Sequence, residues 1–534
     1  MTARASLPNL DTLNPEALKA LIRAQQQTLA EQEEELRSKS DQLAWREAEI
    51  ERLKLLIAKL RRMQFGRKSE KRERQIEQLE LQLDELATAQ AEKALVSQTS
   101  GVAASVAEAG KAVRRPLPDH LPRQVKRILP QETACPGCGG DLKALGEDVS
   151  EMLEYVPARF QVVRQIRPKL ACSRCDKIVQ APAASRPIAR GLAGPGLLAH
   201  VLVSKYCDHL PLYRQEEIYA REGVDLERAT LADWVGGASQ LLSPLVTALQ
   251  RHVMSAAKLH ADDTPVPVLE PGLGRAKTGR LWTYVRDDRP AGDATPPAVW
   301  FAYSPDRKGE HPQSHLRSFT GTLQADGYAG FAHLYASGRI REGACWAHVR
   351  RKFYDLQIAH KSPVAQEALE RIGALYAIET EIRGRSPDER RQIRQARARP
   401  QIESLHTWLE SCLPKLSQKS DTTAAVKYAL GRWEALNRYV EDGTLEIDNN
   451  AAERALRVVA LGRKNYLFAG SDAGGERAAV LYSLVGTAKL NNLDPEAYLR
   501  DVLSRLPDHP INRIEELLPW NFTHHTTNPS SDPQ

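Results

Sequence analysis

The chain has 534 residues, of which 42% are hydrophobic and 27% are charged, and its formal net charge is +6 at pH 7. This length is too great for one ordinary hydrophobic core, so we expect several domains. The charge permits nucleic-acid binding without proving it. Seven cysteines in a chain without a secretory N-terminus favour a reducing cytoplasm over a disulfide framework. No run reaches the roughly 18 apolar residues of a membrane span, so we expect no membrane partner.

The N-terminal segment, 1–94, is expected to form a helical coiled coil. Apolar residues recur there every seven positions, at Leu29, Leu36, Leu43, Ile50 and Ile57. This is the spacing of a coiled-coil seam. A polar-rich helix of this length has few other ways to bury an apolar stripe, so we favour self-association over packing within the chain. Residues 95–130 are expected to be a linker, because their first part is rich in Ala, Ser, Val and Gly.

Two pairs of cysteines lie within a segment that we assign as a small domain, 131–182. Each pair is separated by two residues, and the pairs are Cys135 with Cys138 and Cys172 with Cys175. This spacing is typical of structural zinc sites, in which a tight turn points both thiolates of a pair at one ion. The alternative is four reduced thiols without a metal. We favour a structural Zn²⁺ that folds the domain and takes no part in chemistry.

Residues 183–256 are expected to be mostly helical. One helix ends at Gly223 and a second begins near Leu226. Two helices joined by a short turn are typical of the helix-turn-helix motif, although ordinary helical hairpins have the same pattern. If the second helix is a recognition helix, Arg228 and Thr230 would face DNA.

The apolar pattern changes from a helical to a strand period at 257, the start of a domain that we expect to span 257–470. Strands are predicted at 258–261, 281–285, 298–303, 322–325 and 340–346, and a brief helix at 315–319. The first strand would end at Asp262 and the fourth at Asp326. Residues 362–440 are charged and mostly helical, which indicates an insertion. We expect 471–534 to be a helical segment followed by a disordered tail.

A helix is predicted to start at Asp448-Asn449-Asn450, because Asp and Asn are preferred at helix N-termini. Glu453 and Arg457 are four residues apart and would share one face of this helix. Two Asp at strand ends and a Glu on a helix are ligands that suit a two-Mg²⁺ site for phosphoryl displacement. Three acidic residues can be chosen from any protein of this size, so their placement has to support this interpretation.

Further motifs accompany these acidic segments. They are Phe65-Gly66-Arg67-Lys68-Ser69-Glu70, Cys135-Pro136-Gly137-Cys138, Cys345-Trp346-Ala347-His348 and Gly462-Arg463-Lys464-Asn465-Tyr466. In this combination and order the chain resembles the DDE transposases of the insertion sequence 66 class over nearly all of its length. The resemblance implies a multidomain α+β protein with a ribonuclease H-like α/β catalytic core. In that core the first and fourth strands are neighbours, so Asp262 and Asp326 would meet.

The resemblance implies a transposase that cleaves and transfers DNA strands at the ends of an insertion sequence. Asp262, Asp326 and Glu453 would bind two Mg²⁺ (or Mn²⁺), although the next residue, Asp263, could supply the first ligand instead. Basic residues expected near the DNA backbone are Arg350, Arg351, Lys352 and Arg457. The implied setting is the bacterial cytoplasm, with the protein on the nucleoid when bound to DNA. Small accessory proteins of the same element are further implied partners.

Two alternatives to a transposase stay open from the sequence. One is a ribonuclease H-like nuclease, such as a junction resolvase, which cuts DNA without joining strands. The other is a DNA-binding regulator with an inactive core. The motif Cys345-x-x-His348 would need further ligands to bind a metal, so we expect a structural role for it.

Overall fold

A computed structural model describes residues 117–522, with gaps at 118, 120, 131–133, 157–158, 190, 270–275, 464 and 466–468. The predicted coiled coil and the predicted disordered tail lie outside the described residues. The described part is a mixture of helices and sheets, as expected. None of its helices is both long and apolar enough to cross a membrane.

The segment that carries the four cysteines is a small sheet. Its strands are β1 (Arg123–Arg127), β2 (Leu142–Val156), β3 (Arg159–Cys172) and β4 (Ile178–Gln180). β2 and β3 form a long antiparallel hairpin, and β1 and β4 share the other edge of β3. The amide of Leu153, in β2, donates to the carbonyl oxygen of Leu192, and the carbonyl oxygen of Leu153 accepts the amide of Gly194. Both partners lie just before the first helix that follows. The hairpin is therefore anchored to the helical region.

Three helices follow this sheet: α3 (Pro195–Tyr206), α4 (Leu212–Arg221) and α5 (Arg228–Met254). The predicted short turn lies between α4 and α5, and Gly223 adopts a positive φ of 79° there. α5 is long and mostly buried, with fully covered residues such as Leu231, Val235 and Leu242. It packs against α15 and β7, which are described below. The second helix of the pair is therefore a central element of the main hydrophobic core.

The central sheet has five strands in the order β7-β6-β5-β8-β9. They are β5 (Lys258–Leu269), β6 (Ala276–Arg286), β7 (Ala298–Ser304), β8 (Gly321–Gln324) and β9 (Ile340–Gly343). β5, β6 and β7 pair antiparallel, whereas β8 runs parallel to both β5 and β9. The first and fourth strands of this region are neighbours, as expected. The brief helix predicted at 315–319 lies earlier, at α6 (Glu310–His315).

Short elements connect the strands: η2 (Arg289–Ala291), η3 (Ala329–Phe331) and α7 (Ala332–Ala336). A helical region then follows β9. It consists of α8 (Trp346–His360), α9 (Pro363–Ile382), α10 (Pro387–Ile393), a π-helical turn at Arg394–Ala398, α11 (Arg399–Cys412), η5 (Leu413–Lys415), α12 (Asp421–Leu430) and α13 (Trp433–Glu441). These helices have a hydrophobic core of their own, separate from the main one. The residues of this second core lie between Ala344 and Ile447. We call this region the insertion.

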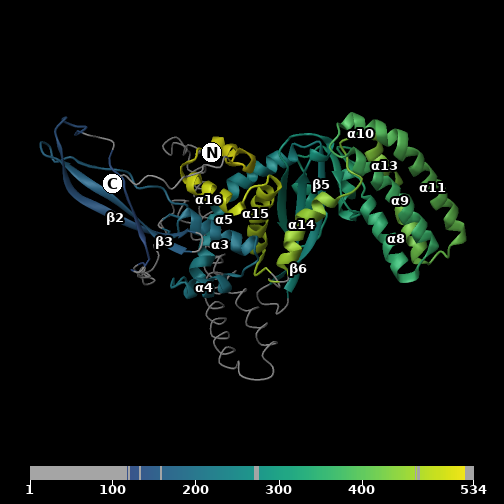
Figure 1. Cartoon of the computed structure of the whole chain (residues 1–534), viewed down its shortest axis with the longest axis horizontal. Helices are drawn as coiled ribbons and strands as arrows, with labels where there is room; N and C mark the ends of the chain where they lie inside the picture. The colour runs from purple at the N-terminus through teal and green to yellow at the C-terminus, as the bar shows by residue number, and fades with distance from the viewer. Residues whose placement is uncertain are drawn as a thin grey trace, which may run out of the picture. The chain divides into compact units, whose positions relative to one another are not determined.

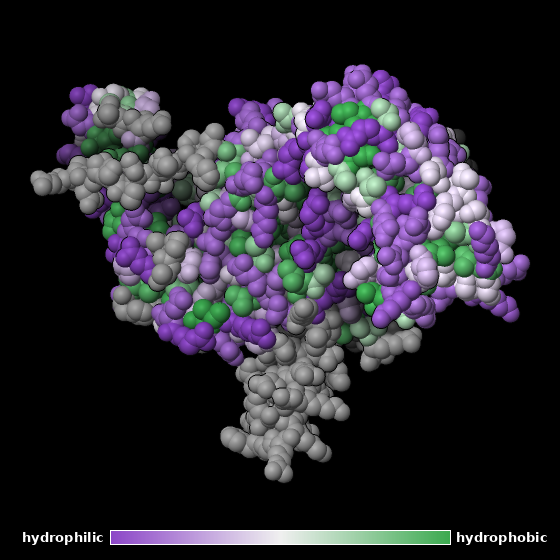
Figure 2. All heavy atoms as spheres, turned by 45° about the vertical axis from the view of Figure 1, so that its right-hand side comes forward, coloured by the Kyte–Doolittle hydropathy of each residue, from purple (hydrophilic) through white to green (hydrophobic). Residues whose placement is uncertain are grey.

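Helices after the insertion return to the sheet. They are α14 (Asn450–Gly462), α15 (Asp472–Leu490), α16 (Pro495–Arg505), η6 (Leu506–Asp508), η7 (Ile511–Leu517) and η8 (Pro519–Asn521). α14 lies against β5 and β6 (Figure 1), and α15 packs against β7. On the face shown in Figure 2, hydrophilic residues predominate and hydrophobic residues form separate patches. The main core includes side chains from both faces of the sheet, such as Trp300 and Phe301 of β7, and α14 lies beside β5.

Candidate functional site

The four cysteines of the predicted zinc site come together at the open end of the β2–β3 hairpin. Their Sγ atoms lie 3.4 Å apart for Cys135 and Cys175, 3.4 Å for Cys138 and Cys172, and 3.5 Å for Cys138 and Cys175. Four sulfurs placed tetrahedrally at about 2.3 Å from one Zn²⁺ are about 3.8 Å from each other, so the cluster fits this ion.

Each cysteine pair sits on a tight turn. The residue after each pair, Gly139 or Asp176, has a positive φ of 66° or 55°, and the amides of these two residues donate to the carbonyl oxygens of Cys135 and Cys172. The backbone amide of Gly137 lowers the pKa of Cys135, whereas at Cys138 the neighbouring thiols outweigh the amide of Gly140 and raise the pKa. A lowered pKa favours the thiolate, which is the form that binds zinc.

Asp262 lies within a strand and not at its end. β5 continues beyond Asp262 to Leu269, so the prediction that the strand ends there is wrong. However, β5 pairs with β8 only from Lys258 to His260. In the described residues, the edge of β5 that faces β8 has no strand partner at Asp262, and Asp326 follows the end of β8 by two residues. The two aspartates therefore occupy the ends of the paired part of β5 and β8.

Glu453 lies in the first turn of α14, as predicted. Its side chain is 44% exposed, whereas that of Asp326 is 24% exposed. Burial raises the pKa of Asp262 to about 7, and repulsion from the carboxylates of Asp326 and Glu453 contributes to this shift. The three carboxylates are therefore close enough to interact, and nearby cations would favour their ionised forms.

The described residues show how the ligand atoms of these side chains are spread. Those of Asp262, Asp326 and Glu453 do not all lie within 4.8 Å of one another, so the three do not surround a single ion. Two metal ions about 3.5–4 Å apart need ligands spread over a wider region. The donor set, which consists of carboxylates alone, suits Mg²⁺.

Both carboxylate oxygens of Asp263 are bound by arginines. Its side chain is only 1% exposed, and Arg280 Nη1 lies 2.9 Å from its Oδ2. Arg307 donates to the other oxygen, Oδ1, at 3.0 Å through Nε and at 2.7 Å through Nη2. Asp262 makes no comparable ion pair among the described residues, and its Oδ1 accepts the amide of Asp263 at 2.7 Å. Of the two neighbouring aspartates, Asp262 is the one with an oxygen available to a metal.

Asn449 joins the start of α14 to β5. Its side chain is fully buried, its Oδ1 accepts from His260 Nδ1 at 3.1 Å, and its Nδ2 donates to the carbonyl oxygen of Ala261 at 2.8 Å. Burial lowers the pKa of His260 to about 4, so the ring is neutral at pH 7 and its Nδ1–H donates to Asn449. Asn449 thus holds the helix of Glu453 against the residue that precedes Asp262.

The motif Cys345-x-x-His348 lies beside α14. The amide of Asn449 donates to Cys345 Sγ at 3.1 Å, and burial raises the pKa of this thiol to about 12. His348 Nε2 lies 3.9 Å from Glu453 Oε1. Cys345, His348 and Glu453 place ligand atoms within 4.8 Å of one another. A protonated, hydrogen-bonded thiol fits the structural role that the sequence led us to expect for Cys345.

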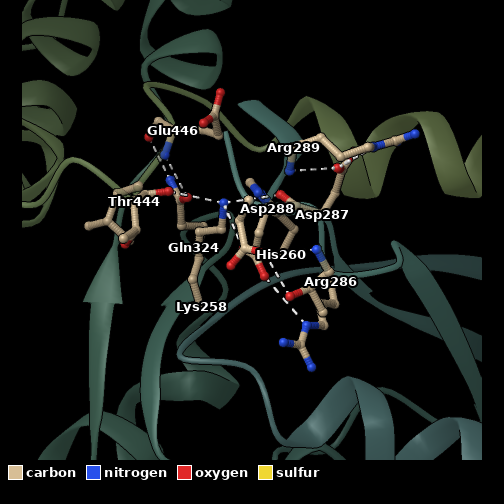
Figure 3. Close-up of polar contacts among 12 residues, drawn as sticks. Lys258, His260, Arg286, Asp287, Asp288, Arg289, Gln324, Thr444 and Glu446 are labelled. Atoms are coloured by element: carbon tan, nitrogen blue, oxygen red, sulfur yellow. Dashed lines mark hydrogen bonds and ion pairs between the residues drawn. The ribbon is translucent and has the colours of Figure 1, made fainter. Parts of the chain in front are cut away.

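A buried polar network ties the sheet to the end of the insertion (Figure 3). Lys258 is 1% exposed, and its Nζ donates to the carbonyl oxygens of Asp287 and Thr444 at 3.1 and 3.0 Å. Gln324 donates to the carbonyl oxygen of Glu446 at 2.6 Å and accepts the amide of Glu446 at 2.9 Å. Gln324 precedes Asp326 by two residues, so this clamp links the strand of Asp326 to the segment that leads into α14.

The basic residues predicted to contact DNA have different surroundings. Arg350, Arg351 and Lys352 are exposed on α8, and Arg457 is exposed on α14. Arg228 and Thr230 are half-buried in the first turn of α5. The described residues contain no ion pair between Arg457 and Glu453, and the ring of His348 lies beside Glu453 instead.

A run of basic residues from 383 to 399 is divided between surface and interior, because Arg383, Arg385, Arg391 and Arg397 are exposed whereas two other arginines are not. Arg390 and Arg394 are buried, where they bind Glu446 and Glu379 at 2.7 and 2.6 Å. Arg394 also donates to the carbonyl oxygens of Tyr439 and Leu445. These two arginines therefore hold the insertion together, and they do not contribute to a basic surface.

Comparison with known proteins identifies the family. The model of the IS66 transposase family matches residues 190–477, which include Asp262, Asp326 and Glu453. The chain belongs to the IS66 transposase family. Models of further IS66 parts match the zinc-finger domain at 132–176 and the C-terminal element at 483–520. A fourth model, described as "Transposase C of IS166 homeodomain", matches residues 52–125.

Two relatives of this IS66 family member are each described as an uncharacterized protein. The protein y4hP of Sinorhizobium fredii (strain NBRC 101917 / NGR234) is 42% identical over 490 residues, which is 88% of each chain. The protein y4qI of the same strain is 38% identical over 526 residues, covering 95% of this chain and 97% of the relative. The family assignment makes DNA the partner of this chain and supports zinc in the four-cysteine site.

Three residues beside the carboxylates were missed by the sequence reasoning. Gln324 had no distinguishing signal, and Arg307 lies in a loop outside every predicted element. Asn449 was assigned only to a helix start, yet its side chain forms no capping hydrogen bond and reaches into the core. A helix N-terminus needs one capping residue, whereas Asp448-Asn449-Asn450 offers three. The surplus was the signal that one of these side chains could have another role.

Proposed function

We propose that this protein is a transposase that cleaves DNA at the ends of an insertion sequence and transfers the freed strand into target DNA. One observation carries the proposal. Asp262 and Asp326 lie at the ends of neighbouring parallel segments, and the helix of Glu453 is held against the same strand by Asn449. Membership of the IS66 transposase family supports the same conclusion.

The central sheet supports a ribonuclease H-like catalytic core as part of this proposal. Three antiparallel strands are followed by two strands that run parallel to the first, in the order β7-β6-β5-β8-β9. Asp262, Asp326 and Glu453 would hold two Mg²⁺ or Mn²⁺ ions. Bound there, the ions would stabilise the attacking and leaving oxygens of phosphoryl transfer.

The residues of the chain itself have defined parts in this proposal. Asp262 and Asp326 are fixed by the backbone of paired strands, and Asn449 and Gln324 set their position relative to Glu453. Site residues on rigid, hydrogen-bonded elements hold a reactive geometry better than residues on loops. We propose that Arg350, Arg351, Lys352 and Arg457, all exposed, contact the DNA backbone, and that Arg228 and Thr230 contact the element ends.

Assembly and location complete the proposal. The coiled coil predicted at 1–94 would join two protomers so that both element ends are held together. Small accessory proteins of the same element would act with the transposase in the cytoplasm, where the complex would lie on the nucleoid. A nuclease that does not join strands would leave cleaved ends without transfer products. A regulator with an inactive core would bind the ends without cleaving them.

Transposition of a marked mini-element, built from the DNA that flanks this gene, tests the function. Wild type, Glu453→Gln and the control Glu434→Gln are compared, with any accessory genes supplied. Glu434 is also a first-turn glutamate, but it lies on α13 and is 88% exposed. We expect movement with wild type and Glu434→Gln and none with Glu453→Gln. Equal movement in all three would remove Glu453 from the mechanism, and cleavage without joining would favour the nuclease.

A further inference from the structure

Arg307 lies between the two aspartate segments of the candidate site. It follows β7 in the chain, and its Nη2 is 2.7 Å from Asp263 Oδ1 and 3.8 Å from Asp326 Oδ2. The guanidinium of Arg307 therefore lies between Asp263 and Asp326. Asp263 is the residue next to Asp262. No residue of the sequence-based site occupies this position.

The position of Arg307 is fixed from several sides. Asp263 accepts two hydrogen bonds from it, and the second oxygen of Asp263 is held by Arg280. The guanidinium lies over the ring of Tyr328, 4.2 Å from the ring centroid. The hydroxyl of Tyr328 donates to the carbonyl oxygen of Arg307. Tyr328 follows Asp326 by two residues, so one short segment carries both a candidate ligand and a support for Arg307.

Burial distinguishes the two arginines that bind Asp263. The side chain of Asp263 is 1% exposed and that of Arg280 is 19% exposed, whereas that of Arg307 is 38% exposed. Arg307 donates through Nε and Nη2, and within the described residues its Nη1 forms no hydrogen bond. Arg307 thus has a buried anchor and an accessible group of N–H donors beside the carboxylates.

We propose that Arg307 binds a phosphate oxygen of the DNA strand that enters the candidate site, and that Asp263 and Tyr328 are positioning residues for it. This inference rests on the proposed function. Arginine presents several N–H donors in a planar fork that matches phosphate oxygens, and it keeps its charge at all relevant pH values. A phosphate bound by Arg307 would lie close to Asp262 and Asp326. Asp263 then serves the arginines and is not a metal ligand.

The test is the salt dependence of DNA binding by the full-length, zinc-loaded protein without added Mg²⁺. The probe is a short duplex that carries the end of the DNA flanking this gene. Arg307→Gln is compared with wild type, with Arg307→Lys, and with the matched control Arg280→Gln, which also removes an ion pair from Asp263. Loss of one phosphate contact lowers the slope of log affinity against log salt by about 0.9.

We expect the slope to fall by this amount in Arg307→Gln, with binding about tenfold weaker at low salt. Arg280→Gln should keep the wild-type slope, and Arg307→Lys should recover most of it. An unchanged slope in Arg307→Gln, with wild-type zinc content and circular dichroism, would overturn the inference alone. Equal slope changes in the Arg307 and Arg280 variants would overturn it too, because they would trace the effect to the shared anchor. Failure of the wild-type protein to bind the duplex would overturn the proposed function as well.

Discussion

Replacing Asn449 by alanine should loosen the joint between α14 and β5. The substitution keeps the backbone bond to Cys345 but leaves His260 Nδ1 and the carbonyl oxygen of Ala261 without their partner. All of these groups are buried. A buried polar group left without a hydrogen bond costs about 1–3 kcal/mol, so the two together cost about 2–6 kcal/mol. At about 2 °C per kcal/mol for a large domain, the unfolding temperature should fall by roughly 4–12 °C.

Circular dichroism of the zinc-loaded chain would follow the unfolding temperature of Asn449→Ala. Because a chain of several domains need not unfold in one step, amide hydrogen exchange should be measured in parallel, with the largest loss of protection in β5 and α14. The matched control is Asn450→Ala, which removes one half-buried bond to Asp448. If Asn449→Ala unfolds at the temperature of the wild type or of this control, the reasoning that Asn449 fixes α14 is refuted.

Two further predictions follow from the zinc site and from the network of Glu446. Purified protein should contain one Zn²⁺ per chain, and Cys138→Ser should lower the zinc content measured by mass spectrometry, whereas Cys412→Ser, outside the cluster, should not. Burial raises the pKa of Glu446, but the charges of Arg390 and Lys258 outweigh it and hold the pKa below its ordinary value. When folding lowers the pKa of a carboxyl group, the ionised group stabilises the fold at pH values above its unfolded-state pKa, which is about 4.3 for Glu. This stability is lost as the pH falls through the folded-state pKa. Wild type should therefore lose stability below about pH 4 more steeply than Glu446→Gln in thermal unfolding; parallel pH profiles would contradict this.

The sequence predicted features whose cause is local. The cysteine spacing predicted the four-sulfur cluster, since a two-residue gap fits one tight turn. The start of α14 followed from residues that favour helix N-termini. Strand period predicted the five strands of the central sheet, and the family resemblance predicted the adjacency of β5 and β8.

Features that depend on distant partners were missed. The end of β5 was misplaced: the strand continues past Asp262 through Pro265 and Pro267, which lack amide hydrogens. The structure tolerates both prolines because β5 has left β8 there; among the described residues it pairs with β6 and forms one isolated bridge, between Val268 and Ala469. The same limit applies to Arg390 and Arg394, which look like surface charges in the sequence. Their buried partners, Glu379 and Glu446, lie elsewhere in the chain.

The insertion leaves and rejoins the core at one place. The amide of Trp346, its first helical residue, donates to the carbonyl oxygen of Ile447 at 3.1 Å, so the two ends of the segment lie side by side. The helices between them have a separate hydrophobic core. The number of residues between Asp326 and Glu453 is consequently decoupled from the distance between their carboxylates. We therefore expect that a designed chain could lengthen, shorten or exchange this region as a unit while the distance between these carboxylates stays the same.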